Sequence, residues 1–203
     1  MTAIFEAPAE TLGEHIARLQ TVEAEADSVQ AWQPMLIPGA LQSFAYAGEA
    51  IRSTSPALPA ETIGERAEAR LRRIDQLRAP AVFILDESAL YRPVGGYEAL
   101  VDQLDHLLTV EALQPRLSLR ILPQGGEAHP GLAGGFTLYR AAGRRAVFVE
   151  QLTGSEISLR PDDVAAYASA WARLEASALP PAESRDLIEA TREAMWRRLR
   201  ARR

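Results

Sequence analysis

The stretch AVFIL, residues 81–85, decides the fold class of this chain. It is apolar throughout, contains β-branched and aromatic residues, and is too short for a helix of ordinary length. Such a run is typical of a strand that is buried on both faces of a sheet, so it predicts a central strand. The polar residues 86–88 follow it directly and end the strand.

Helical periodicity precedes this strand. Apolar residues recur every three or four positions over three stretches, which is typical of helices with one buried stripe. The predicted helices cover residues 11–29, about 39–51 and 61–77. Residues 1–9 lack the pattern and are expected to be a flexible leader, and residues 32–39 contain two Pro and predict a connector. We therefore expect a helical part over residues 10–78.

Alternating strands and helices follow the central strand. The predicted elements are a helix at 97–108, a strand at 116–122, a loop at 123–135, a hairpin of strands at 136–141 and 146–151, a short strand at 156–159, and helices at 162–178 and 182–203. This order predicts an α+β fold with N-terminal helices, a mixed, mostly antiparallel sheet of about five strands, one crossover helix and two C-terminal helices. We expect residues 79–160 to hold the sheet and residues 1–203 to form a single domain. Trp171 and Trp196 lie on apolar helical stripes and are predicted to anchor the last two helices.

Two residue types that carry much of enzyme and metal chemistry are missing. The 203 residues contain no Cys, and all 22 basic residues are Arg because no Lys occurs. Disulfides, thiolate nucleophiles, iron–sulfur clusters, Schiff bases and Walker-type phosphate loops are therefore excluded. The three His are far apart in the sequence, which argues against a multi-histidine metal site. We expect no metal and no other cofactor.

Charge and hydropathy limit the partners of the chain. The net charge of −5 argues against specific DNA binding. The Arg-rich residues 197–203 fit the C-terminus of a helix, where cations complement the helix dipole. The apolar runs are too short to span a bilayer, and no basic region followed by an apolar stretch marks a signal peptide. We expect a cytoplasmic protein with no membrane association.

Three polar residues stand at predicted strand ends. Glu87 follows the strand at 81–85, Glu150 ends the second strand of the hairpin, and His129 lies in the Gly-rich loop before the hairpin. Ligand sites of mixed sheets often form at strand ends, so these side chains could share a pocket and bind a polar ligand or transfer protons. Each also has a structural alternative: helix capping for Glu87, loop bracing for His129 and an ion pair for Glu150.

Tyr91 and Arg92 form a second polar cluster beside Glu87. The planar guanidinium of Arg92 suits a carboxylate or phosphate, so we expect both residues to contribute to ligand binding. The alternative is a salt bridge of Arg92 within the fold.

A series of short motifs resembles a known family. The motifs are Ile37-Pro38-Gly39-Ala40-Leu41-Gln42-Ser43, Arg70-x-x-Arg73, Leu85-Asp86-Glu87-Ser88-Ala89-Leu90, Ala128-His129-Pro130-Gly131 and Val149-Glu150-Gln151-Leu152-Thr153-Gly154. From about residue 12 onward the chain is similar to the domain of unknown function that follows a helix-turn-helix in many bacterial regulators of the xenobiotic-response-element type. The resemblance implies an effector- or partner-binding module, without an established chemistry.

The chain departs from that family in two respects. Only about ten residues precede the first matching helix, so we expect a stand-alone effector domain without the DNA-binding unit. Ala40, Ser43, Gly48, Ile74 and Gln151 replace residues that are usual in the family. These changes indicate an altered ligand, or a domain that has taken on another task.

Two functions remain open from the sequence. The first is a small-molecule-binding sensor, with a protein partner or a homodimer as a further possibility. The second is a cofactor-independent enzyme of a specialised biosynthetic pathway, in which Glu87, His129 and Glu150 are the catalytic residues of an acid–base cyclisation, isomerisation or hydrolysis. The family precedent favours the first function, and the expected loss of DNA binding favours the second.

Overall fold

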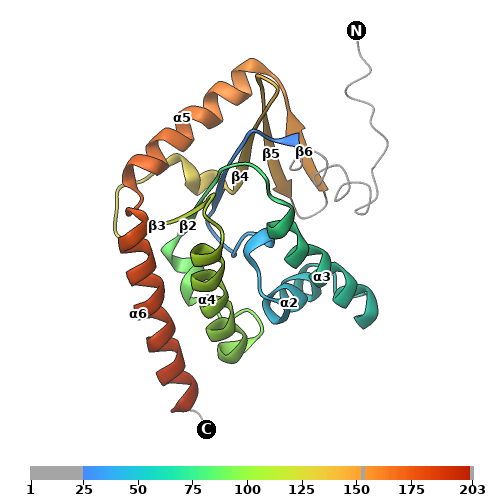
Figure 1. The fold of residues 1–203 in the computed structure, drawn as a ribbon, viewed down its shortest axis with the longest axis vertical. Coiled ribbons are helices and arrows are strands. Elements are labelled where there is room, and N and C mark those ends of the chain that lie inside the picture. The colour runs from blue at the N-terminus through green and yellow to red at the C-terminus, as the bar shows by residue number, and fades with distance from the viewer. Residues whose placement is uncertain (1–24, 152–153, 202–203) are drawn as a thin grey trace.

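The computed structural model describes residues 25–151 and 154–201, in which helices flank a six-stranded sheet (Figure 1). The strands are β1 (Ser28–Gln33), β2 (Ala81–Asp86), β3 (Leu117–Leu122), β4 (Phe136–Ala141), β5 (Arg144–Gln151) and β6 (Gly154–Ser158). The α-helices are α2 (Phe44–Thr54), α3 (Ala60–Gln76), α4 (Gly96–Leu113), α5 (Pro161–Ser177) and α6 (Pro181–Arg200). The short 3₁₀ helices are η1 (Gly39–Leu41), η2 (Glu87–Tyr91) and η3 (Pro130–Ala133).

The sheet combines parallel and antiparallel pairing. β1, β2 and β3 are parallel, whereas β4 is antiparallel to both β1 and β5, and β5 is antiparallel to β6. Parallel neighbours need a crossover connection: α2 and α3 join β1 to β2, and α4 joins β2 to β3. The predicted α+β class and mixed sheet are confirmed. The sheet has six strands and two crossover connections, where the sequence predicts about five and one.

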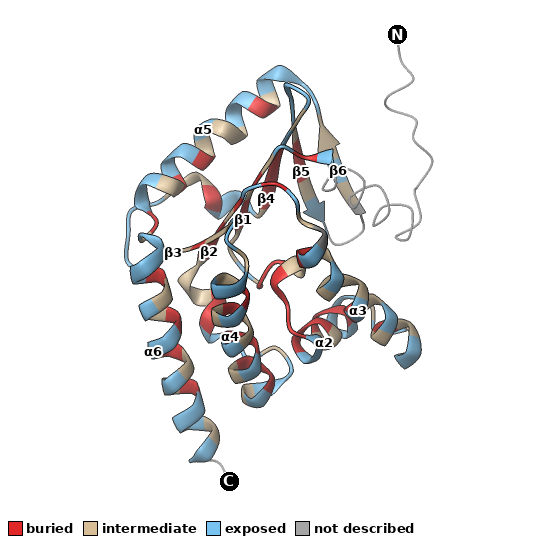
Figure 2. Ribbon diagram, in the orientation of Figure 1, coloured by how far each residue is buried: buried red, intermediate tan, exposed pale blue. Residues whose placement is uncertain are grey.

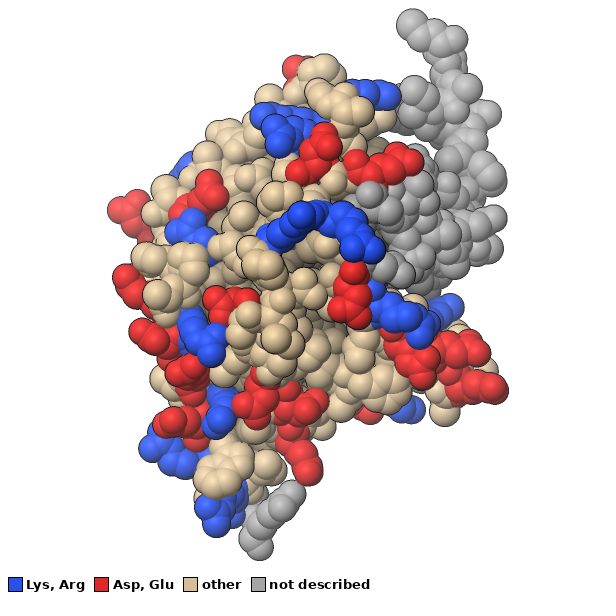
Figure 3. Space-filling view, viewed as in Figure 1, with Lys and Arg blue, Asp and Glu red and all other residues tan. Residues whose placement is uncertain are grey.

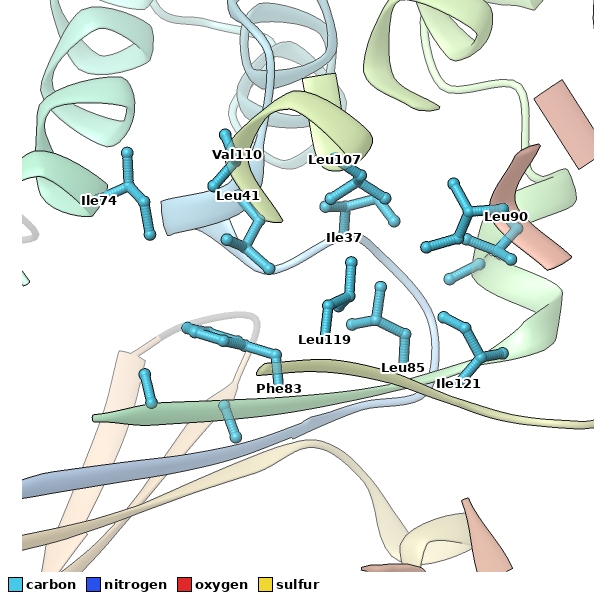
Figure 4. Packing of buried hydrophobic residues seen from close by; sticks show 14 of the residues in the cluster. Ile37, Leu41, Ile74, Phe83, Leu85, Leu90, Leu107, Val110, Leu119 and Ile121 are labelled. Carbon is cyan, nitrogen blue, oxygen red and sulfur yellow. The ribbon is translucent and has the colours of Figure 1, made fainter. Parts of the chain in front are cut away.

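Helices cover both faces of the sheet. α2, α3, α4 and α6 pack on one face, here called the helix-rich face, and α5 crosses the opposite face (Figure 1). On the helix-rich face, Phe83 and Leu85 of β2 point toward the layer that contains Leu107 of α4 (Figure 4). Ile84 belongs to the cluster beneath α5. Because β2 is covered on both faces, its continuous apolar run is explained.

The prediction for residues 28–33 is wrong, whereas residues 34–38 form a connector as predicted. Ser28–Gln33 forms β1, the strand between β2 and β4, where the sequence predicts a helix end and a connector. The apolar spacing that suggests a helix at 11–29 continues into this strand, and residues 11–24 lie outside the described residues. Val29 and Ala31 face the helix-rich side, and Trp32 is completely buried on the α5 side. Burial on both faces has therefore overridden the local helical pattern.

The connection between α5 and α6 covers the free edge of β3. The Leu179 amide donates to the Ile121 carbonyl over 2.8 Å. The Ile121 amide donates to Ser184 Oγ over 2.9 Å. Arg120 Nε donates to the Leu179 carbonyl over 2.9 Å. The two bonds at Ile121 satisfy backbone groups that an uncovered edge strand would expose to other chains.

The two helix-anchor predictions have different outcomes. Trp171 of α5 is buried against the sheet, with 3% of its surface exposed, so this prediction is confirmed. Trp196 is 43% exposed and lies beneath the Arg200 guanidinium at 4.6 Å, so it is not a buried anchor. Met195 occupies the buried stripe of α6 instead, and Figure 2 shows this stripe turned toward α4.

Within residues 25–151 and 154–201, no helix combines the length and apolar character needed to cross a bilayer.

Candidate functional site

The carboxyl ends of the parallel strands define one edge of the sheet. β1, β2 and β3 are parallel neighbours and end at this edge, whereas β4, the other neighbour of β1, begins there. In open sheets with parallel strands, ligands bind outside the carboxyl ends of the strands. The segment after β1, residues 34–43, therefore lies where a ligand site is expected.

Buried polar side chains hold this segment in place. Gln103 of α4 is fully buried; its Oε1 accepts the Ser43 amide over 2.7 Å, and its Nε2 donates to the Leu41 carbonyl over 2.8 Å. The Ile37 amide donates to Tyr46 Oη over 3.3 Å. Burial raises the pKa of Tyr46, so its hydroxyl stays protonated. The backbone of this segment is thus fixed by α2 and α4.

Arg70 approaches the same segment from α3. Its Nη1 donates to Gln42 Oε1 over 2.7 Å, and Gln42 Nε2 donates to the Ile37 carbonyl over 2.8 Å. Burial lowers the pKa of Arg70, although a guanidinium remains charged in a protein. Gln42 therefore fixes the position of a cation at the carboxyl edge of β1.

Among the described residues, the charges of two arginines and one glutamate act on Arg70. Arg66 and Arg73 lie on the same side of α3, four residues before it and three after it, and their charges also lower the pKa of Arg70. The charge of Glu150 acts in the opposite direction and raises it. A Cβ at Gly39 would lie only 3.3 Å from Arg73 Nη1, so the arginine side chains pack closely on the η1 backbone.

Glu150 reaches this region from β5. Successive side chains of a strand point to opposite faces. Phe148 packs on the helix-rich face and Val149 beneath α5, so Glu150 lies on the helix-rich face, where α3 carries Arg70. Glu150 is exposed. It is therefore a rim carboxylate beside a more buried cation.

Glu87 and Tyr91 lie together at the end of β2. Tyr91 Oη donates to Glu87 Oε1 over 3.1 Å, and the Gln124 amide donates to Glu87 Oε2 over 2.8 Å. Thr191 of α6 donates to Tyr91 Oη over 3.5 Å. Glu87 thus links η2 to the loop after β3, and Tyr91 links η2 to α6.

Arg92 contacts the segment 34–43 at the Met35 backbone. Its Nε donates to the Met35 carbonyl over 3.1 Å. Its charge also opposes the effect of burial on Tyr46 and lowers the pKa of that hydroxyl. Arg92 therefore borders the segment that Arg70 and Gln42 border, although it is exposed.

His129 belongs to the α5 side of the sheet. Its ring meets the Trp32 indole edge-on, with centroids 5.5 Å apart and an angle of 88° between the planes. Its Nδ1 is buried and makes no hydrogen bond with any described residue. Since Trp32 packs beneath α5 and Glu150 lies on the helix-rich face, His129 and Glu150 are on opposite sides of the sheet.

The structure does not gather the five predicted site residues into one pocket. Glu87 follows β2 and Glu150 lies in β5, and the two strands are separated by β1 and β4. Three inter-strand spacings place the two strands about 14 Å apart. Glu87 and Tyr91 form one group, His129 another, and Arg92 and Glu150 border the segment 34–43 and the Arg70 site respectively.

Sequence reasoning assigned no role to Arg70, Arg73 or Gln42. The signal was present, because Arg66, Arg70 and Arg73 form a stripe on one side of a predicted helix. A charged helix face is usually solvated, and only the position of η1 shows that this stripe meets a buried amide. Within the described parts of the chain, no group of three or more His, Cys, Asp or Glu could hold a metal ion.

These features define an α+β domain with a cationic site at the carboxyl edge of its parallel strands. The chain belongs to the family of the domain of unknown function DUF5753, which it matches over residues 16–190. No curated protein matches the chain. Three of the motifs quoted from the sequence, at 37–43, 70–73 and 149–151, contribute residues to the Arg70 site.

Proposed function

We propose that the chain is an effector-binding domain, of the kind attached to xenobiotic-response-element regulators, and that it binds a small anionic molecule at Arg70. The observation that carries this proposal is the incomplete hydrogen bonding of the Arg70 guanidinium. Among the described residues, Gln42 is its one hydrogen-bond acceptor, although a guanidinium has five N–H donors in a planar fork. The remaining donors suit a carboxylate or a phosphate.

The surrounding charges support an anionic ligand. Arg66 and Arg73 add positive charge, and among the described residues the carboxylate that acts on Arg70 belongs to the exposed Glu150. Glu150 is placed to accept a hydrogen bond from a donor group of the same ligand. The ligand class is thus a small molecule with one anionic group and one hydrogen-bond donor.

Binding without catalysis is favoured by the arrangement of the acid–base candidates. Glu87 already accepts two hydrogen bonds, and His129 lies on the opposite side of the sheet from Glu150. The three residues therefore do not form an acid–base pair around one substrate. DNA binding by this domain is not part of the proposal, and Figure 3 shows acidic and basic side chains interleaved over the viewed face.

Calorimetric titration with inorganic phosphate and with phosphoserine tests the proposal. Arg70→Gln should weaken the binding of both by about tenfold or more, as expected for a lost hydrogen bond to a charged group. Arg72→Gln is the matched control: it removes the same charge from an exposed pair with Glu68 on α3 and should leave affinity nearly unchanged. Equal losses in both variants, or no binding by the natural chain, would overturn the proposal.

Glu150→Gln separates the roles at this site. Inorganic phosphate should bind more tightly, because a competing negative charge is removed. Phosphoserine should gain less or bind more weakly, because its ammonium group loses a negatively charged partner. If instead the chain converts a bound ligand and Glu150→Gln reduces turnover far more than affinity, the enzyme is the correct assignment.

A further inference from the structure

A hollow lies on the face of the sheet that α5 crosses, between α5 and the strands. Its volume is about 370 Å³, within the range of small-molecule sites. The side chains around it include Ser28 and Gln30 of β1, Leu138 and Arg140 of β4, Arg145 of β5 and Ala168 of α5. The hollow is separated from Arg70 by the sheet, so it is a different site from the one proposed above.

Two arginines lie side by side at this hollow. Arg140 and Arg145 are direct partners in the register of β4 and β5, and Ser28 is the partner of Arg140 on β1. Directly opposed side chains have Cβ atoms about 5 Å apart, and like charges in such a pair are destabilising. No described carboxylate forms a salt bridge with either arginine.

Two acidic side chains in this part of the fold, Asp27 and Asp163, have other partners. Asp27 accepts the Ala142 amide over 2.9 Å. Asp163 of α5 accepts Ser158 Oγ over 2.6 Å and lies 3.7 Å from Arg160 Nε. The repulsion between the two opposed arginines is therefore left uncompensated by the described part of the protein, and an anion between them would relieve it.

The shape of α5 leaves room for such an anion. Trp171 and Val164 are buried against the sheet on either side along the helix, but the hollow is bordered by the small side chain of Ala168. Ser28 and Gln30 add a hydroxyl and an amide, and neither side chain makes a hydrogen bond within the described residues. Two cations, two free polar groups and an apolar wall at Leu138 thus border the same space.

We propose that this hollow binds a small phosphate monoester, with the phosphate between Arg140 and Arg145 and the organic part between Leu138 and Ala168. A phosphate monoester carries close to two negative charges at neutral pH, which matches two arginines better than a single carboxylate does. Ser28 and Gln30 select polar groups of the ligand. The domain therefore has two anion sites, one on each face of its sheet.

Phenyl phosphate is the probe, and its binding to the full chain is monitored through the amide NMR signals. Binding should shift the signals of Ser28, Gln30 and Ala168. Arg145→Gln should weaken it by about tenfold or more, and Arg173→Gln, which removes an exposed charge from α5, should change it little. Ala168→Leu keeps every charge but fills the hollow, so it should abolish binding while the chain remains folded by circular dichroism.

The two anion sites can be distinguished by their variants. Arg70→Gln should leave the phenyl phosphate shifts at Ser28 and Gln30 unchanged, and Arg145→Gln should leave unchanged the shift that phosphoserine causes in the amide signal of Gln42, beside Arg70. Absence of shifts at Ser28, Gln30 and Ala168, or equal losses in Arg145→Gln and Arg173→Gln, would overturn the hollow as a site. Equal affinity for benzoate would overturn the choice of a phosphate.

Discussion

Gly131 lies directly against the indole of Trp32. Trp32 Nε1 donates to the Gly131 carbonyl over 3.0 Å, and a Cβ at Gly131 would lie 2.6 Å from the same nitrogen. The contact joins the loop between β3 and β4 to the carboxyl end of β1.

Gly131→Ala should therefore destabilise the protein. Neither the fully buried indole nor the η3 backbone can move freely, and overpacking of this kind costs about 1–3 kcal/mol. For a chain of this size, each kcal/mol lowers the melting temperature by roughly 2–4 °C. Gly126→Ala in the same loop is the control, because an added Cβ there meets nothing within 4 Å. Equal melting temperatures of the two variants would contradict the role given to the Gly131 contact.

Gln103→Leu should lower both stability and ligand affinity. The change keeps the approximate volume of the side chain but leaves the Ser43 amide and the Leu41 carbonyl buried without partners, at a cost of about 1–3 kcal/mol for each unsatisfied group. The segment that carries Gln42 would then be less well fixed. Chemical denaturation and phosphate titration measure the two effects. Gln124→Leu, at an exposed position, should change neither.

The strands that could be predicted from the sequence are those whose pattern of apolar and polar residues matches their burial. β2 is recognisable because both of its faces are covered by helices, which makes every residue of its core apolar. β1 is equally central but reads SVQAWQ, because Ser28 and Gln30 border the hollow beneath α5. Polar residues at those two positions remove the apolar pattern of a central strand, so the position of β1 could be learned only from the structure.

The candidate site was predictable only in part for a similar reason. Glu150 was selected because strand ends carry ligand sites, and it does lie at the sheet edge beside Arg70. Glu87 and His129 satisfy the same rule, but neighbouring strands and the two faces of the sheet separate them from Glu150. Strand order and side-chain direction determine which polar ends meet, and both depend on pairings between residues far apart in the chain.

Trp171 and Trp196 should respond very differently to truncation. Trp171→Ala removes a buried side chain from the α5 cluster and should cost about 3–5 kcal/mol. Trp171→Phe should cost less, because the buried indole N–H has no hydrogen-bond partner among the described residues. Trp196→Ala loses mainly its contact with Arg200, about 0.5–1 kcal/mol. Denaturant titration measures all three, and similar costs for the two alanine variants would be inconsistent with the burial described.

His106 should make the stability of the fold depend on pH. Burial in α4 lowers the pKa of His106 below its ordinary value of 6.5, and the nearby charge of Asp102 opposes this by raising it. The unfolded chain therefore binds a proton at this residue more readily than the folded chain does. Stability is unaffected above the unfolded pKa and falls as the pH decreases through 6.5 toward the folded pKa. The free energy of unfolding should thus be lower at about pH 5.5 than at about pH 7.5, a window that lies above ordinary carboxyl pKa values.

The His106→Gln side chain cannot titrate, so this variant should reduce the difference in the free energy of unfolding between the two pH values. Asp102→Asn should enlarge it, because the lost carboxylate no longer raises the pKa of His106. A variant pair that shifts the pH dependence in the same direction would show that His106 is not its source.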